Sequence, residues 1–404
     1  MKVVHVSTST TGGAGIAALR LHCGLLQKSV DSSFIALYTS KKGAFPNNIF
    51  QFNHNYSLLN RIKRKLNLPV LQQKENNTMI HGLKKDYELF SFPFTDFRVE
   101  EDDLLRNADI VHLHWVSNFI NYPTFFKKIK KPIVWTFHDM NPLLGGFHYL
   151  GDKYRNESFS SIEERLKKMK IAELKHSNNL TVVTPSQWLG NDLKMNSAFT
   201  NVRYAHIPYG LDLSVFKPQD KSFARSQFNI PLGRKVILFV SENLTNYRKG
   251  FDLLTEAIRE IDLASEFLLV SIGKGKTGFS QNGRIMALGK ITDDRLMSLL
   301  YSAADVFVLP SREDNFPNVM LEAMACGTPV IAFDRGGMKE VIRNNYNGML
   351  VEDVTAKGLR TAIELFISGQ CSFDSKEIRD FAVHNFDLIL QASRYLNLYQ
   401  RILA

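Results

Sequence analysis

Two carboxylates at a fixed spacing are the groups in this sequence whose chemistry is clearest. Asp314 lies in a polar loop after a predicted strand, residues 306–309, and Glu322 lies one turn into the helix that should follow. The backbone N–H groups of the loop and the positive end of that helix favour a phosphate group. Carboxylates beside such a phosphate can accept hydrogen bonds from sugar and ribose hydroxyl groups. Gly327 should end the helix, and Pro329 prevents its continuation.

A glycine-rich turn near the start of the chain could also approach a phosphate. Gly12, Gly13 and Gly15 follow the predicted strand 3–7 and open an amphipathic helix. Glycines let the backbone come close to an anion, and a helix N-terminus favours negative charge. The same spacing fits the fingerprint of dinucleotide-binding proteins, which place an acidic residue about 20 positions later. The second strand ends in the acid-free segment 38–42, which counts against NAD.

Two α/β domains are needed to position these residues. Predicted strands alternate with helices in both halves of the chain, which is typical of parallel sheets covered on both faces. Pro208, Gly210 and Pro218 mark the join, so we expect domains at residues 1–208 and 209–386. Ligands of such sheets bind at the carboxyl ends of the strands, which predicts a cleft between the domains. The predicted strands are 3–7, 33–38, 109–114, 132–137 and 180–184 in the first half, and 235–241, 267–272, 286–288, 306–309 and 329–333 in the second.

Composition excludes several classes of protein. The chain has 404 residues, of which 44% are hydrophobic and 22% charged, as in an ordinary globular protein long enough for two domains. The three cysteines, Cys23, Cys326 and Cys371, have neither disulfide nor metal-ligand spacing, which fits a reducing compartment. The sequence shows no signal peptide and no apolar stretch of membrane-spanning length, so we expect a cytoplasmic location.

The net charge of +10 is concentrated in two basic clusters. No nucleic-acid-binding motif accompanies them, so no nucleic-acid partner is expected. The first cluster is interleaved with apolar residues, which suits peripheral binding to an anionic membrane surface. A solvated basic face on a soluble protein is the alternative. The first cluster contains Arg61, Lys63, Arg64 and Lys65 among Leu58, Leu59, Ile62 and Leu66, and the second contains Lys127, Lys128, Lys130 and Lys131.

Residues 310–330 resemble the signature of the retaining glycosyltransferases of family 4, which have the GT-B fold. That signature has two acidic residues separated by seven others, followed by the run Glu-Ala-Met-Ala-Cys-Gly-Thr-Pro-Val that begins with the second acid. The pair here is Asp314 and Glu322, with Asp where the family normally has Glu and with Glu313 beside it. The resemblance implies an α/β chain of two Rossmann-like, doubly wound parallel-sheet domains facing a cleft, whose last helix, residues 387–404, crosses back onto the first domain.

The same resemblance assigns a nucleotide-sugar site to the second domain. In the family a Lys and an Arg grip the diphosphate; Lys249 matches the Lys, while Asn243 or Arg248 must replace the missing Arg. Glu322 is expected on the ribose, and Ile291 lies in the segment that resembles the loop near the nucleobase. The remaining donor-binding candidates are Gly12 and Gly13 of the glycine turn, and Asn315, Phe316, Asn318 and Val319 of the signature.

A histidine at the end of the predicted strand 132–137 is the candidate for the reacting centre. By resemblance, His138 faces the donor sugar and is catalytic together with Asp314. His114 and Asp139 are candidates for the acceptor side of the site. His112 and His114 share one face of a strand, so a metal site with Asp139 is an alternative. We expect no metal, because Lys249 and the carboxylates already account for a metal-free donor site.

The resemblance therefore implies a retaining, metal-independent glycosyltransferase without a cofactor. It would move a sugar from a nucleotide-sugar to a saccharide or lipid-linked saccharide acceptor, in the synthesis of bacterial surface polysaccharide. The alternatives are a GT-B epimerase, an NAD-dependent enzyme and a non-catalytic nucleotide-sugar-binding protein. A phosphorylase is disfavoured because its pyridoxal-binding lysine motif is missing. The presence of both Lys249 and Glu322 argues against a non-catalytic binding protein.

Overall fold

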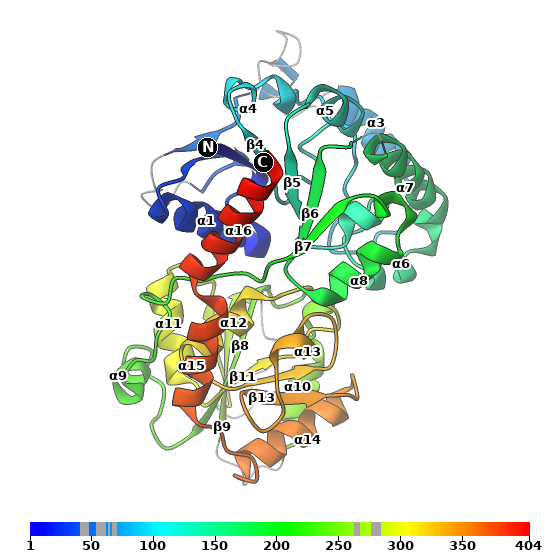
Figure 1. Ribbon diagram of the computed structural model, residues 1–404. Coiled ribbons are helices and arrows are strands. Elements are labelled where there is room, and N and C mark those ends of the chain that lie inside the picture. Colours follow the sequence, from blue (N-terminus) through cyan, green and yellow to red (C-terminus); the bar gives the residue numbers. More distant parts are fainter. Residues whose placement is uncertain are drawn as a thin grey trace. The chain divides into compact units, whose positions relative to one another are not determined.

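The computed structural model in Figure 1 describes residues 1–40, 48–53, 62–63, 65–66, 71–175, 177–261, 267–275 and 284–404. These residues form two compact units. Unit 1 comprises Met1–Pro208 and Gln391–Ala404, and unit 2 comprises Tyr209–Leu390. Each unit contains one parallel sheet with helices between its strands.

Unit 1 is built on a seven-stranded sheet with the order β3-β2-β1-β4-β5-β6-β7. All its strand pairs are parallel, and the central strands β4, β5 and β6 are buried along their whole length. The sheet grows in opposite directions from β1, which makes the β1–β4 boundary the switch point where such folds bind ligands. The strands are β1 Lys2–Ser9, β2 Asp31–Tyr38, β3 Ile49–Gln51, β4 Ile110–Leu113, β5 Ile133–Thr136, β6 Leu180–Thr184 and β7 Arg203–His206.

Helices of unit 1 connect successive strands and bury their apolar sides against the sheet. The main aromatic core contains Trp135, Phe137 and Phe147, which contact one another or neighbouring rings edge to face. The described helices and 3-10 turns are α1 Gly12–Gln27, α3 Leu71–Met79, η1 Val99–Glu101, α4 Asp103–Arg106, α5 Tyr122–Lys128, η2 Asn141–Leu143, α6 Leu150–Arg155, η3 Glu157–Phe159, α7 Ser160–Leu174, α8 Gln187–Met195 and η4 Ser197–Phe199.

The last helix, α16 (Leu388–Leu403), supplies part of the core of unit 1. Tyr395 and Tyr399 are fully buried in an apolar cluster with residues of α1, β1 and β4, and α16 lies beside α1 (Figure 1). The Tyr399 hydroxyl lies 2.6 Å from Nδ1 of His112, and the Tyr395 hydroxyl lies 2.8 Å from the Thr136 hydroxyl. Both phenol groups therefore find hydrogen-bond partners in the interior of the sheet.

Unit 2 has a six-stranded sheet with the order β10-β9-β8-β11-β12-β13, again with parallel pairs only. Its strands are β8 Lys235–Asn243, β9 Phe267–Lys274, β10 Ile285–Gly289, β11 Val306–Leu309, β12 Val330–Phe333 and β13 Gly348–Val351. Its described helices are α9 Lys221–Ser226, η5 Tyr247–Lys249, α10 Phe251–Arg259, α11 Asp294–Ala303, α12 Asn318–Ala325, α13 Met338–Val341, α14 Ala356–Ile367 and α15 Ser375–Phe386.

Two doubly wound parallel sheets confirm the fold class predicted from the sequence. Three strands, β3, β7 and β13, were not predicted. Each is a short strand at the edge of its sheet, and none is buried along its whole length. Their apolar runs are therefore weaker than those of central strands. Among the described residues, no helix is long and apolar enough to cross a membrane.

Candidate functional site

The loop that carries Asp314 is held by glycines of two neighbouring loops. It joins β11 to α12, at the edge of the sheet of unit 2 where the parallel strands end. Gly250 has φ 70°, and a Cβ atom there would lie 1.8 Å from the Pro310 carbonyl oxygen. Gly336 has φ 57°, and its Cβ atom would lie 1.9 Å from the carbonyl oxygen of Asp314. Only glycine fits these two positions, so the loops after β8, β11 and β12 interlock.

The Asp314 carboxylate is paired with the two cations predicted to bind a diphosphate. Its Oδ2 atom lies 2.6 Å from Nζ of Lys249 and 3.4 Å from Nη1 of Arg248. Arg248 also donates to the Glu313 carbonyl oxygen at 3.1 Å. The Ser311 hydroxyl donates to the same Oδ2 atom at 3.4 Å. The structure thus brings Arg248, Lys249 and Asp314 together in one charged cluster, in which Lys249 is partly exposed.

Arg312, another cation of the signature loop, has a different partner. Its two terminal nitrogens donate to the two carboxylate oxygens of Asp252 at 2.8 and 2.6 Å. The guanidinium also stacks on Tyr247, 3.9 Å from the ring centroid. Such a bidentate pair has a defined geometry, so Arg312 fixes the loop to η5 and the first turn of α10.

Glu322 is buried on α12, where it accepts a hydrogen bond from a residue that the sequence did not indicate. The Tyr301 hydroxyl on α11 donates to Oε2 of Glu322 at 3.0 Å. The Thr328 hydroxyl, in turn, donates to the Tyr301 carbonyl oxygen at 2.7 Å. Tyr301 therefore orients the carboxylate. Its place on α11 gave no signal for this role, since a Tyr there also fits an apolar helix face.

The other candidates of unit 2 have varied surroundings. Asn243 is exposed at the end of β8, where its Oδ1 atom accepts from the N–H and the hydroxyl of Thr245 at 3.0 and 2.9 Å. Ile291, between β10 and α11, and Val319, in the first turn of α12, are partly buried. Phe316 packs edge to face against Tyr209 and Phe386, so its ring belongs to the core of the unit. Asn315 and Asn318 are buried in the signature segment.

The glycine turn of unit 1 opens α1 directly. Gly12 has φ 75° and is the first residue of the helix, followed by the exposed Gly13. A Cβ atom on Gly15 would lie 2.5 Å from the Ser9 carbonyl oxygen, so this glycine is required where the helix leaves β1. Residues 41–42, part of the acid-free strand end used against NAD binding, lie outside the described residues.

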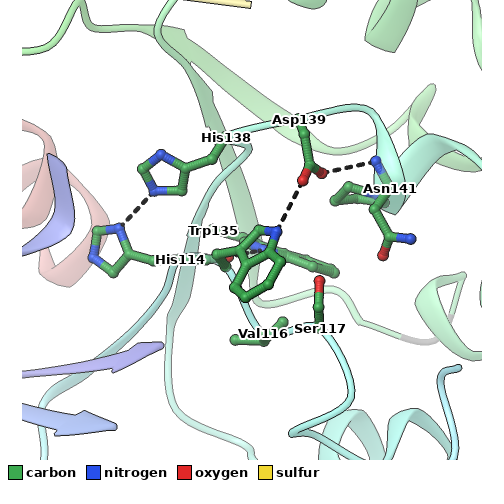
Figure 2. Close-up of a pocket in the computed structure, with 9 residues that line it drawn as sticks. His114, Val116, Ser117, Trp135, His138, Asp139 and Asn141 are labelled. Carbon is green, nitrogen blue, oxygen red and sulfur yellow. Dashed lines mark hydrogen bonds between the residues drawn. The ribbon is translucent and has the colours of Figure 1, made fainter. Parts of the chain in front are cut away.

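His138 follows β5, and its imidazole lies against that of His114 in unit 1 (Figure 2). Its Nε2 atom lies 3.1 Å from Nδ1 of His114, and Nε2 of His114 lies 2.8 Å from Nδ1 of His5. Burial lowers the pKa of His138 to about 4, although the charge of Asp139 opposes this shift. The imidazole of His138 is therefore neutral at physiological pH.

Asp139 is engaged by neighbouring groups of unit 1. Its Oδ2 atom accepts from Nε1 of Trp115 at 2.9 Å and contacts Nδ1 of His148 at 2.5 Å, and its Oδ1 atom accepts from the Asn141 N–H at 2.9 Å. Burial opposes ionisation, but His148 and these hydrogen bonds outweigh it and lower the pKa of Asp139. Nε2 of His148 lies 2.8 Å from the Ser91 hydroxyl. These contacts show a carboxylate that holds its own loop (Figure 2).

Two of the three residues of the alternative metal site, His112 and His114, lie in a cluster of possible metal ligands in the structure. Within the described part of the chain, His5, His112 and His114 have ligand atoms within 4.8 Å of one another, and Asp139 is not a member of this group. Both nitrogens of His112 already have partners, Tyr399 at 2.6 Å and Thr136 at 2.8 Å. A metal would have to replace these hydrogen bonds, so the geometry favours a hydrogen-bonded cluster.

The two basic clusters differ in their surroundings. In the second cluster, Lys127 pairs with Glu173 at 3.3 Å, and Lys128 pairs with Glu101 at 2.6 Å. Lys131 donates to the Ala108 carbonyl oxygen at 2.6 Å. In the first cluster, Ile62 and Leu66 are 49% and 64% exposed; Arg61, Arg64, Leu58 and Leu59 lie outside the described residues. Much of the charge of the second cluster is thus compensated within unit 1.

Solved structures identify the class of fold. The chain is 19% identical to sucrose-phosphate synthase from Thermosynechococcus elongatus, with a TM-score of 0.70 over 100% of this chain and 99% of that one. It is 16% identical to Anabaena Alr3699/HepE, solved in complex with UDP and glucose, with a TM-score of 0.67 over 99% of both chains. Together with the two parallel sheets, these similarities establish the GT-B fold that the sequence predicted.

Sequence comparisons point to one family of enzymes. Residues 234–368 match the family described as "Glycosyl transferases group 1". A curated relative, D-inositol 3-phosphate glycosyltransferase of Segniliparus rotundus, is 33% identical over 161 residues, which are 36% of this chain. The match spans 35% of the length of that relative. The matched family segment contains Arg248, Lys249, Asp314 and Glu322.

Proposed function

We propose that this protein is a retaining glycosyltransferase that uses a nucleotide-sugar donor bound by unit 2. The observation that carries the proposal is the charged cluster of Arg248, Lys249 and Asp314 beside the start of α12, followed on that helix by Glu322. A diphosphate would bind Lys249 and Arg248, and the ribose hydroxyls would bind Glu322. The match of residues 234–368 to the group 1 family and the UDP and glucose in the complex of Alr3699/HepE support this choice of donor class.

In the proposed reaction, the bond between the anomeric carbon and the diphosphate oxygen breaks while an acceptor hydroxyl oxygen bonds to that carbon. The acceptor proton passes to the leaving phosphate oxygen. Negative charge grows on the diphosphate, and Lys249 and Arg248 stabilise it. Retaining hydrolases use a carboxylate nucleophile instead. Here Asp314 is paired with two cations, which makes its carboxylate a poor nucleophile. We therefore favour direct attack of the acceptor on the same face of the sugar from which the diphosphate leaves.

The proposed acceptor is a saccharide or lipid-linked saccharide used in building bacterial surface polysaccharide. The name of the Segniliparus rotundus relative contains D-inositol 3-phosphate, a phosphorylated polyol. A GT-B epimerase is the second candidate. Product analysis separates the two, because an epimerase converts the nucleotide-sugar without any acceptor, whereas a transferase releases the nucleoside diphosphate.

Thermal stabilisation by nucleotide-sugars tests the donor proposal. UDP-glucose is the first probe, followed by ADP- and GDP-sugars and by NAD as a control. The stabilisation should persist in EDTA, because Lys249 and Arg248 supply the positive charge for the diphosphate. Glu322→Ala should weaken donor binding at least about tenfold, since a hydrogen bond to a charged group contributes about 1.5–3 kcal/mol.

Three results would contradict this donor assignment. They are stabilisation by NAD alone, a strict requirement for a divalent ion, and unchanged donor affinity in a folded Glu322→Ala variant. A requirement for a divalent ion would make the His5, His112 and His114 cluster a candidate metal site.

We further propose that the protein works at the cytoplasmic face of a membrane through its first basic cluster. The exposed Ile62 and Leu66 beside basic residues support this proposal. Neutralising Arg61, Lys63, Arg64 and Lys65 to Gln should abolish salt-sensitive sedimentation with anionic vesicles. The same change at Lys127, Lys128, Lys130 and Lys131 is the matched control and should have a smaller effect. Failure of the wild-type protein to bind at low salt would refute peripheral attachment.

A further inference from the structure

Three imidazoles in unit 1 form a hydrogen-bonded chain across neighbouring strands. His5 lies on β1, His114 directly follows β4, and His138 follows β5. The contacts are Nδ1 of His5 to Nε2 of His114 at 2.8 Å, and Nδ1 of His114 to Nε2 of His138 at 3.1 Å. Figure 2 shows the second contact, with His114 and His138 pointing toward each other. Trp135 holds the backbone of this row by donating from Nε1 to the His114 carbonyl oxygen at 3.0 Å.

The chain is made of neutral rings. Burial, reinforced by repulsion from neighbouring histidines, lowers the pKa of His5 and His114 well below the ordinary value. A neutral imidazole has one N–H donor and one acceptor nitrogen. Each ring in the chain must therefore donate on one side and accept on the other, so the two hydrogen bonds point in the same direction. Only two arrangements satisfy this requirement, and they give His138 opposite tautomers.

The inner end of the chain distinguishes the two arrangements. Nε2 of His5 is buried and has no hydrogen-bond partner, and the ring lies between Phe34, which it stacks on, and His22, which it meets edge to face. If the chain pointed inward, this nitrogen would carry a buried N–H without an acceptor, a rare arrangement in proteins. If the chain points outward, the nitrogen carries only a lone pair. The outward direction is therefore favoured.

We propose that His114, oriented by His5, is a positioning residue that fixes the tautomer of His138. In the outward arrangement, Nδ1–H of His5 donates to His114, and Nδ1–H of His114 donates to Nε2 of His138. His138 then carries its proton on Nδ1, with Nε2 occupied as an acceptor. The sequence makes His138 a candidate for the reacting centre of the function proposed above, and its tautomer and ring orientation are set before any ligand binds.

NMR of protein labelled with ¹⁵N-histidine tests this assignment without any substrate. Two-bond ¹H–¹⁵N correlations distinguish a protonated from an unprotonated ring nitrogen, and His138→Gln identifies the His138 signals by their disappearance. The expected result at pH 7 is His138 protonated on Nδ1 only. Protonation of His138 on Nε2 would overturn the proposed direction of the chain.

Paired substitutions separate positioning from packing. In His114→Asn the side-chain amide can still donate from near the Nδ1 position, so His138 should keep its tautomer. In His114→Phe the donor is lost, and His138 should become a mixture of tautomers. His22→Asn is the matched control, because His22 is a buried imidazole outside the chain, with Nδ1 2.7 Å from the Ser32 hydroxyl. Equal His138 spectra in His114→Phe and wild type would overturn the positioning role.

The link to the proposed reaction has its own readout. Adding UDP-glucose should shift the His138 signals in wild type and in His114→Asn, and shift them at least twofold less in His114→Phe. A Nδ1–H tautomer that no nucleotide-sugar perturbs would contradict the proposed function while leaving the chain intact. If His114→Phe does not fold, His5→Leu removes the inner donor of the chain, and altered His114 signals are then expected. Unaltered His114 signals would contradict its orientation by His5.

Discussion

Lys249 pairs with Asp314 in the structure, and this contact orients the lysine before a donor binds. Its Nζ atom lies 2.6 Å from the carboxylate, and Arg248 reaches the same oxygen at 3.4 Å. A diphosphate would therefore bind to cations that a carboxylate already holds in place. Such prior orientation means that little reorganisation is needed when negative charge develops on the leaving group.

Replacing Lys249 by Ala should reduce turnover by at least about 100-fold, because loss of one donor that stabilises developing charge has effects of that size. Unfolding should change by less than about 1 kcal/mol, since a partly exposed ion pair contributes little to stability. Steady-state transfer and thermal unfolding measure the two effects. Lys376→Ala, at an exposed position of α15, is the control. Turnover within twofold of wild type would remove Lys249 from the proposed site.

At this scale, the sequence predicted residues that lie in one continuous motif and missed those brought in from elsewhere. Asp314 and Glu322 were proposed from their spacing, and Lys249 from its position after a strand. Tyr301 and His5 gave no such signal, because a Tyr on an apolar helix and a His in a strand also occur as ordinary core residues. Their contacts with Glu322 and His114 depend on tertiary packing across 21 and 109 residues of chain.

At the scale of elements, α7 fastens the segment that follows β5. Glu163 accepts from the N–H groups of Gly145 and Gly146, each at 2.7 Å. Lys170 donates to the carbonyl oxygens of Asn141 and Leu144 at 2.9 and 3.2 Å. Burial lowers the pKa of Lys170 to about 7, against the opposing charge of Glu163. One helix thereby satisfies the donors and the acceptors of a buried loop, the loop that begins at His138 and Asp139.

Glu163→Gln should destabilise unit 1 by about 1–3 kcal/mol, because the amide N–H₂ would face backbone N–H groups that need an acceptor. The three tryptophans, Trp115, Trp135 and Trp188, all lie in unit 1, so their fluorescence in urea reports the unfolding of this unit alone. Glu164→Gln is the matched control. The side chain of Glu164, which neighbours Glu163 in the sequence, is 56% exposed, and its carboxylate lies 3.8 Å from Nζ of Lys168. Equal midpoints for both variants would contradict this role of Glu163.

The elements themselves were largely predictable where burial leaves a strong pattern. Central strands such as β5 and β11 are short apolar runs that differ clearly from the polar segments around them. The exposed edge strand β3 lacks this contrast. The hold of α7 on its loop was not predictable, because Glu163 and Lys170 lie in a run of charged residues that reads as an exposed helix face.

For the molecule as a whole, the buried histidines predict sensitivity to acid. Burial is the main cause that lowers the pKa of His5, His112, His114 and His138 in the folded state. In the unfolded chain they titrate near pH 6.5. Below that pH, the unfolded state binds protons that the folded state does not, so stability is fully present above about pH 6.5 and falls as the pH drops.

Urea unfolding at pH 7.5, 6.5 and 5.5, followed by tryptophan fluorescence, should show this loss for unit 1. Each buried imidazole contributes up to about 1.4 kcal/mol per pH unit below the unfolded pKa. In His138→Gln, the slope of the free energy of unfolding against pH should decrease by the contribution of one imidazole, up to about 1.4 kcal/mol per pH unit. A free energy of unfolding that stays constant down to pH 5.5 would show that these rings are charged in the folded state or are not buried.

The helix α16 has a consequence for how the chain folds as it is made. Residues 391–404 complete a core that begins with Val3 and includes strands β1 and β4. All of unit 2 lies between these two parts in the sequence. During synthesis, the ribosome therefore releases the whole of unit 2 before unit 1 can receive Tyr395 and Tyr399. Until then, His112 and Thr136 lack their phenol partners, and the apolar face of unit 1 that α16 covers stays exposed. Unit 2 is synthesised after most of unit 1, yet all of its residues are available first.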